Sequence, residues 1–189
     1  MQTALDSTYL KIKYLGKLDK LVEYINNIPA DLILRIDFNN ALSFDEVISF
    51  WDQVEFKDRI EYLEDPVLLS NKTDARLRAI GVPMACDRNI FNDQNYMFQV
   101  LKPNRDFIPD KSRHKIIFSS YMGHEIGIYH SFLHLLTYGD LTLYHGIDTP
   151  GIYEEYNGLF NNHKDSLIID EKKIENLYED LKNKKWKAL

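Results

Sequence analysis

The sequence predicts an α/β fold in which a parallel sheet curls into a TIM-type (β/α) barrel. Short apolar segments recur along the chain, and connections of a dozen or more residues separate them. Connections of that length require parallel pairing through crossovers. A polar or charged residue ends nearly every segment, as on the active-site face of a barrel. An open, doubly wound sheet is the alternative, but it would gather such groups at one switch point.

The first predicted strand covers residues 9–13 and leads into a helix over residues 18–25, where apolar residues recur at helical spacing. The second strand covers residues 32–37. The next helix begins at Ser43, because Glu46 stands three residues later and the two can form a capping box. The chain therefore opens with two strand–helix units.

The third and fourth strands flank a further helix. Residues 59–64 form the third strand, which Pro66 ends. A helix over residues 72–80 is followed by Gly81, the residue type that most often ends a helix in the left-handed conformation. Residues 82–87 then form the fourth strand.

Three more strands are predicted over residues 97–102, 115–120 and 141–145, which makes seven in all. We expect residues 1–160 to form the (β/α) barrel domain with its metal site. Residues 161–189 are expected to form a C-terminal helical segment that packs on the barrel, because apolar residues recur there at helical spacing among many charges.

Composition limits the class of protein. The 189 residues suffice for one domain with a buried core, and 44% apolar and 28% charged residues are ordinary for a globular chain. A net charge of -6 without a basic cluster argues against nucleic-acid and anionic-membrane binding. One cysteine and no long apolar run favour a soluble protein of the cytoplasm.

The strand ends carry, in chain order, a lysine pair, three acids and a further lysine. These residues are Lys11, Lys13, Asp37, Glu64, Asp87 and Lys102. Carboxylates from neighbouring strands supply the oxygen ligands that suit octahedral Mg²⁺. A divalent ion there can stabilise an oxyanion on a bound carboxylate while a lysine removes the adjacent proton. The pattern therefore predicts a Mg²⁺-dependent enzyme acting on a small carboxylate.

Side chains alternate along a strand, so we expect Lys11 and Lys13 to share one face while Ile12 faces the helices. The same parity places Asp37 and Asn39 together. Repulsion between the two ammonium groups is expected to lower at least one lysine pKa, which makes a neutral amine available as a base.

The strand-end motifs, taken as a set, resemble the barrel signatures of the enolase superfamily in its muconate-lactonizing branch. They read Lys-Ile-Lys at 11–13, Arg-Ile-Asp-Phe-Asn at 35–39, Leu-Glu-Asp-Pro at 63–66, Ala-Cys-Asp at 85–87 and Val-Leu-Lys-Pro at 100–103. The chain is most similar to the o-succinylbenzoate synthase family of menaquinone biosynthesis. Residues 119–127 and 146–149 resemble the seventh-strand and eighth-strand loops of that family.

The resemblance implies a role for each of these charged residues. Asp37, Glu64 and Asp87 would be the Mg²⁺ ligands. Lys13 would take the proton next to the substrate carboxylate and deliver it to the leaving hydroxyl, so that water is lost by syn elimination. Lys11 would contact the substrate carboxylate.

Further implied roles concern the substrate pocket. Lys102 would lie across the ring of the intermediate in a cation–π contact. Asn39, Ser119, Ser120 and Gly146 would shape the pocket. The product implied by the resemblance is o-succinylbenzoate, formed from a cyclohexadiene carboxylate.

The chain departs from the family at its start. Members carry a capping domain before the barrel, whereas this sequence opens almost directly on the Lys-Ile-Lys strand. A complete barrel typically takes about 250 residues. We therefore expect the capping domain and the first barrel strand to be missing here, and a separate capping domain or a second copy of the chain to be a partner.

Other activities use the same charged residues. A muconate cycloisomerase, a dipeptide epimerase and an N-acylamino-acid racemase share the metal site and the lysines. An epimerase is expected to show Asp-x-Asp on the eighth strand, which residues 143–148 do not contain. A truncated, non-catalytic barrel is the alternative outside enzymes.

Overall fold

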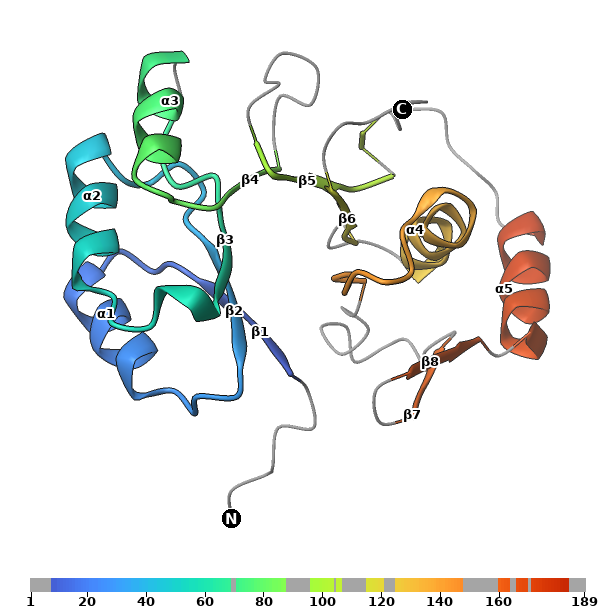
Figure 1. Ribbon diagram of the computed structural model, residues 1–189. Coiled ribbons are helices and arrows are strands. Elements are labelled where there is room, and N and C mark those ends of the chain that lie inside the picture. Colours follow the sequence, from blue (N-terminus) through green and yellow to red (C-terminus); the bar gives the residue numbers. More distant parts are fainter. Residues whose placement is uncertain are drawn as a thin grey trace.

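The computed structural model describes residues 8–68, 71–87, 96–103, 105–106, 115–120, 125–147, 160–163, 166–169 and 171–183. Within these residues, six strands form one sheet in the order β1-β2-β3-β4-β5-β6, and every neighbouring pair is parallel. The spatial order follows the chain order without reversal, as in the wall of a barrel and unlike a doubly wound sheet. Figure 1 shows the sheet curling as it runs from β1 to β6.

Each of the six strands lies inside a segment predicted as a strand. Their bounds are β1 (Tyr9–Lys13), β2 (Ile33–Asp37), β3 (Ile60–Glu64), β4 (Met84–Cys86), β5 (Phe98–Leu101) and β6 (Lys115–Phe118). The strand predictions over these segments are therefore confirmed.

The predicted seventh strand over residues 141–145 is wrong. The segment begins with a turn in which Oδ1 of Asp140 accepts hydrogen bonds from the backbone N–H and the hydroxyl of Thr142, at 3.0 and 2.6 Å. Such local side-chain bonds compete with a strand ladder. Extended pairing with β6 is confined to one parallel bridge between Ser119 and Gly146.

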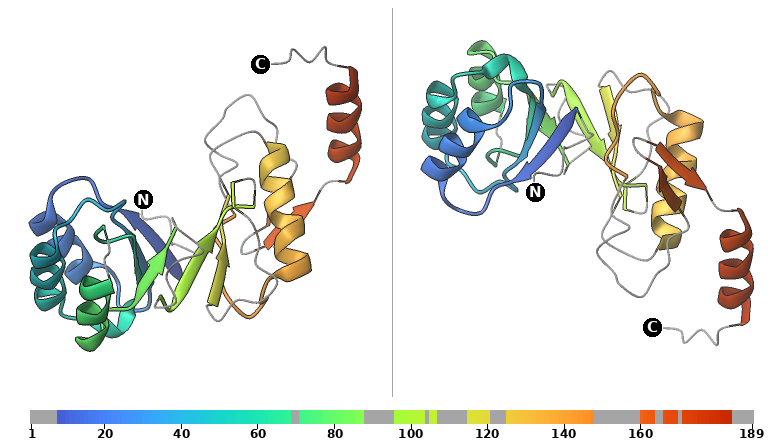
Figure 2. Two further views of the ribbon diagram at one scale, coloured as in Figure 1. Left: turned by 90° about the horizontal axis from the view of Figure 1, so that it is seen from above. Right: turned by 90° about the horizontal axis from the view of Figure 1, so that it is seen from below.

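The helices lie outside the curled sheet. Their bounds are α1 (Leu18–Asn27), α2 (Phe44–Gln53), η1 (Lys57–Arg59), α3 (Asn71–Ala79), α4 (Glu125–Tyr138) and α5 (Glu171–Asn183). In Figures 1 and 2, α1, α2 and α3 stand side by side against β1 to β4, and α4 lies beside β6. None of the helices in the described part of the chain is long and apolar enough to span a membrane.

The predicted helix ends are confirmed. Ser43 and Glu46 form the capping box, with the Ser43 N–H 2.8 Å from Glu46 Oε2 and the Glu46 N–H 3.3 Å from Ser43 Oγ. Gly81 has φ of +79°, and the N–H groups of Gly81 and Val82 donate to carbonyls of the last turn of α3 at 2.9 and 3.1 Å. This is the Schellman pattern that Gly81 permits.

A two-stranded antiparallel hairpin, β7 (Phe160–His163) with β8 (Ser166–Ile169), precedes α5. Apart from Phe160, this hairpin occupies residues that were expected to belong to a helical segment. The short polar run of β7 carries no clear strand pattern, which explains the omission.

Alternation along the strands separates the apolar residues that face the helices from those on the concave side of the sheet. Outward residues such as Leu34 and Ile36 are fully buried against Phe50 of α2 and the other helices. Inward residues of β3 to β6, including Tyr62 and Val100, form a separate apolar cluster on the concave side. Because each strand places alternate side chains inward, the polar residue at its carboxyl end lies above this inner core.

Candidate active site

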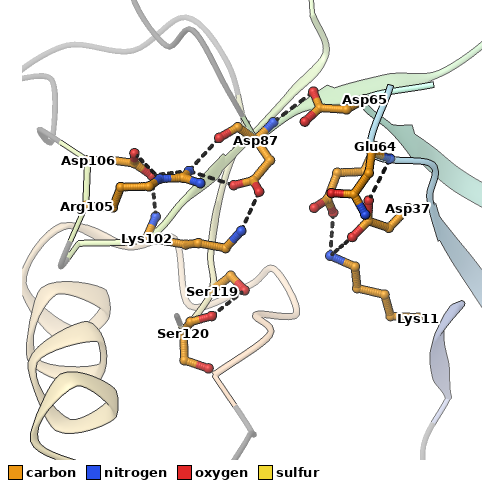
Figure 3. A network of polar contacts seen from close by, with 11 residues as sticks. Lys11, Asp37, Glu64, Asp65, Asp87, Lys102, Arg105, Asp106, Ser119 and Ser120 are labelled. Atoms are coloured by element: carbon orange, nitrogen blue, oxygen red, sulfur yellow. Dashed lines mark hydrogen bonds and ion pairs between the residues drawn. The ribbon is translucent and has the colours of Figure 1, made fainter. Parts of the chain in front are cut away.

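The three predicted metal ligands lie at the carboxyl ends of consecutive strands. Asp37 at the end of β2 lies in register with Lys13 of β1 on one side and with Glu64 of β3 on the other. Asp87 follows β4 directly. Figure 3 shows these carboxylates between the side chains of Lys11 and Lys102.

Lys11 points from β1 toward two of these acids. Its Nζ lies 2.6 Å from Oε2 of Glu64 and 3.5 Å from Oδ2 of Asp37. Burial by itself lowers the pKa of Lys11, but the charges of Glu64, Asp37 and Asp87 outweigh burial and raise this pKa above its ordinary value. The pKa of Lys11 is therefore not lowered by repulsion from Lys13, as the sequence suggested it could be, because the carboxylates raise it.

Glu64 is the most buried member of the group, with only 1% of its side chain exposed. Burial raises the pKa of Glu64 to about 7; the charge of Lys11 opposes this shift, and the charges of Asp37 and Asp87 add to it. The charges of the other two acids thus reach Glu64 across the strand ends. A cation placed among them would relieve both the desolvation and the mutual repulsion.

Lys102 approaches the group from β5. Its Nζ forms an ion pair with Oδ2 of Asp87, while Nη2 of Arg105 lies 2.8 Å from Oδ1 of the same carboxylate. Asp106 joins this network, since its Oδ1 accepts from Nε of Arg105 at 2.7 Å and its Oδ2 accepts from the backbone N–H of Lys102 at 2.8 Å. The loop after β5 therefore holds Asp87 from two sides.

Sequence reasoning missed Asp65, Arg105 and Asp106. Asp65 has φ of +42°, is buried, and accepts a hydrogen bond from the Asp87 backbone N–H at 3.2 Å through Oδ1. The only signal for it was its place directly after Glu64. Arg105 and Asp106 had no signal, because a loop residue shows no periodicity from which its direction follows.

Lys13 and Asn39 lie at the open end of the strands, and both are exposed. The expected shared face of Asp37 and Asn39 is wrong, since β2 ends at Asp37 and Asn39 has a left-handed backbone with φ of +51°. The backbone N–H of Asn39 instead lies 3.2 Å from Oδ1 of Asp37. Asn39 thus belongs to a turn that orients Asp37.

The predicted pocket residues at the end of β6 are brought together. Ser120 N–H donates to the Gly146 carbonyl at 3.1 Å, and Gly146 N–H donates to the Phe118 carbonyl at 2.9 Å. A Cβ on Gly146 would lie 3.7 Å from the Ser119 hydroxyl, so this contact leaves room for a small side chain. Residues 121–124 and 148–149 of the two predicted loops lie outside the described residues.

His145 is expected to make the fold more stable at neutral than at acidic pH. Its Nδ1 accepts from the Phe118 N–H at 3.1 Å and its Nε2 donates to the Asp140 carbonyl at 3.0 Å, which requires a neutral ring. Burial lowers the pKa of His145. The unfolded chain takes up this proton near pH ~6.5, whereas the folded chain resists it. The contribution is therefore complete above pH ~6.5 and is lost as the pH falls.

The variant His145→Asn keeps an acceptor near Nδ1 but cannot titrate. Its melting temperature, compared with that of the wild type on both sides of pH ~6.5, should depend less on pH. An unchanged pH dependence would contradict this role for His145.

The acids also fit a divalent cation by their chemistry. Among the described residues no group of three potential ligands is already arranged around one point, since ammonium groups hold the carboxylates instead. Nevertheless, three carboxylates at the ends of adjacent strands, one of them buried and with a raised pKa, are the kind of oxygen donors that Mg²⁺ prefers.

Solved structures with the same fold were found by structural comparison. Muconate lactonizing enzyme from Pseudomonas putida matches with a TM-score of 0.70 at 15% identity, over 89% of this chain and 57% of that protein. The o-succinylbenzoate synthase from Thermosynechococcus elongatus BP-1, described with Mg in its active site, matches with 0.59 at 17% identity, over 92% and 59%.

A third neighbour is 3,6-anhydro-D-galactonate cycloisomerase from Zobellia galactanivorans, with a TM-score of 0.56 at 16% identity, over 73% of this chain and 46% of that protein. At these identities the three neighbours show a shared fold. This chain spans less than two thirds of their length. No protein-family model and no curated protein sequence matches it.

Proposed function

We propose that this chain forms the metal-binding barrel wall of an enolase-superfamily lyase that converts a cyclohexadiene carboxylate into o-succinylbenzoate, in menaquinone biosynthesis. One observation carries the proposal. Carboxylates from three consecutive strands converge at the carboxyl end of a parallel sheet, between Lys11 of β1 and Lys102 of β5. The fold shared with o-succinylbenzoate synthase supports it.

Asp37, Glu64 and Asp87 would hold Mg²⁺, because their oxygens already lie at adjacent strand ends on the concave side. When bound, Mg²⁺ supplies positive charge that stabilises the substrate carboxylate as it gains electron density. Asp65 and Arg105 would keep Asp87 oriented through its backbone N–H and its carboxylate.

Lys13 would perform the proton transfer. It stands beside Asp37 at the open end of β1, where an exposed amine can reach a bound molecule. The amine takes the proton from the carbon next to the carboxylate, a carbon–carbon double bond forms, and the carbon–oxygen bond to the leaving hydroxyl breaks. Lys13 returns the proton to that hydroxyl, which departs as water. A single lysine on one face suffices for this syn elimination.

Lys11 would orient the substrate carboxylate, and Lys102 would face the ring across the site. The pocket wall would come from Asn39, Ser119, Ser120 and Gly146. In the complete enzyme, a first barrel strand and a capping domain would close the barrel and exclude water. This part of the proposal rests on the fraction of the matched structures that lies beyond this chain.

A cycloisomerase or racemase on the same residues is the second candidate. The structural match to muconate lactonizing enzyme favours it, and racemisation would use Lys13 and Lys102 as its two bases, both of which this chain has. Assays with muconate and with N-acylamino acids separate these activities from the dehydration.

The proposal is tested by following o-succinylbenzoate formation in ultraviolet light. We expect turnover with Mg²⁺ and none with excess chelator, and the variant Glu64→Gln should lose most of the activity because one buried ligand oxygen becomes an amide. Turnover that survives the chelator, or no turnover in protein that binds Mg²⁺, would contradict the proposed reaction.

A further inference from the structure

Two lysines already form ion pairs with the three acids of the candidate cation site. Lys11 contacts Glu64 and Asp37, and Lys102 contacts Asp87. Together the two ammonium groups carry the charge of one divalent ion. We propose that Lys11 and Lys102 are built-in counter-ions, which hold the carboxylates together without metal and are displaced when a divalent cation binds. This inference rests on the proposed function, because it takes these three acids as the ligands.

Burial explains why a counter-ion is needed at Glu64. With 1% of its side chain exposed, this carboxylate is almost completely shielded from solvent. Its Oε2 lies 2.6 Å from Nζ of Lys11, whose own side chain is 42% exposed. An isolated buried charge is strongly destabilising, so the partly solvated ammonium compensates for it. Because Lys11 retains access to solvent, it can move away when another cation takes its place.

Lys102 differs from Lys11 because its acid, Asp87, has a second cationic partner. Asp87 is paired with Lys102 through Oδ2 and with Arg105 through Oδ1, at 2.8 Å for the latter. Removal of Lys102 therefore leaves Asp87 with a cation. Removal of Lys11 leaves Glu64 without the ammonium that it contacts. Substitution of Lys11 should therefore lower the stability of the metal-free chain more than substitution of Lys102 does. Both substitutions should raise the affinity for a divalent cation.

The affinity for Mg²⁺ should be limited by the two ammonium groups, because they compete with the cation for the same carboxylates. A cation must separate each ion pair before it binds, and each displaced ammonium remains within a few ångströms of it. Loss of one ammonium group removes, at its own ion pair, the cost of separating the pair and the repulsion between the displaced ammonium and the cation. The dissociation constant for Mg²⁺ is therefore expected to fall about tenfold or more in Lys11→Met and in Lys102→Met. Lys20→Met on the exposed surface of α1 is a control with the same change in net charge.

The experiment is calorimetric titration of Mg²⁺ into the wild type and these three variants, with melting temperatures in chelator and in Mg²⁺. Lys11→Met and Lys102→Met should bind more tightly than the wild type, and Lys20→Met should match it. Lys11→Met should also have a lowered melting temperature in chelator that Mg²⁺ restores, whereas Lys102→Met should change little in chelator.

The outcomes separate this inference from the proposed function. If the wild type binds Mg²⁺ through Glu64, as loss of binding in Glu64→Gln would show, and neither lysine variant binds more tightly, the counter-ion role is wrong and the function stands. If only the lysine variants bind, the counter-ion role is supported and metal dependence of the wild type is wrong. If no variant binds, both are wrong.

Discussion

Replacement of Lys13 by alanine is expected to lower the rate of o-succinylbenzoate formation by about 10³-fold, the range in which general acid–base groups contribute. The proposed reaction passes its proton through this amine twice, so no step proceeds normally without it. The side chain is exposed, so its removal should leave the melting temperature close to that of the wild type. Steady-state kinetics with Mg²⁺ measure the effect.

The matched control is Lys17→Ala, an exposed lysine in the turn before α1. This variant should keep wild-type kinetics. If Lys13→Ala loses activity only through a raised KM, with kcat unchanged, Lys13 binds the substrate and another group transfers the proton. That result would move the role of base to Lys102 or Lys11.

Replacement of Arg35 by methionine is expected to destabilise the fold by about 3 kcal/mol, the lower end of the cost of breaking a buried ion pair, because the partner Glu61 keeps 17% of its side chain exposed. Arg35 is only 5% exposed, and its Nε lies 2.5 Å from Oε2 of Glu61. Its Nη2 also donates to the Tyr144 carbonyl at 2.8 Å, and its guanidinium lies 5.0 Å from the Tyr9 ring centroid. Arg35 of β2 therefore contacts β1, β3 and the segment before Gly146 at once.

Urea denaturation of Arg35→Met measures this loss. The paired variant Arg35→Met with Glu61→Gln should recover much of the stability, because it removes the orphaned charge. Equal destabilisation of the single and double variants would show that the guanidinium stabilises through Tyr144 and the aromatic rings rather than through Glu61.

Much of the fold could be predicted because its signals are local. Each strand from β1 to β6 is an apolar segment of the expected length, and capping groups at Ser43 and Gly81 mark helix ends. The three acids could be placed at strand ends for the same reason. The strand prediction for residues 141–145 was wrong because the apolar content of this segment resembles a strand, whereas the hydrogen bonds between Asp140 and Thr142 form a turn.

The network behind the acids could not be predicted. Arg105 and Asp106 occupy a loop, and Asp65 has a left-handed backbone that strand parity does not describe. Their directions depend on where the loop after β5 crosses the end of β4. That crossing is set by the pairing of the strands and by no pattern within the loop itself.

The sequence by itself determined the strands of the six-stranded sheet, the helices from α1 to α3 and the set of charged residues at the strand ends, since alternation and capping act over a few neighbouring residues. Only the tertiary structure decided which charges meet. Lys11 contacts Glu64, 53 positions away, rather than acting chiefly on Lys13. That choice depends on the register and curvature of the sheet, which bring the carboxylates nearer to the ammonium group than their spacing in the sequence indicates.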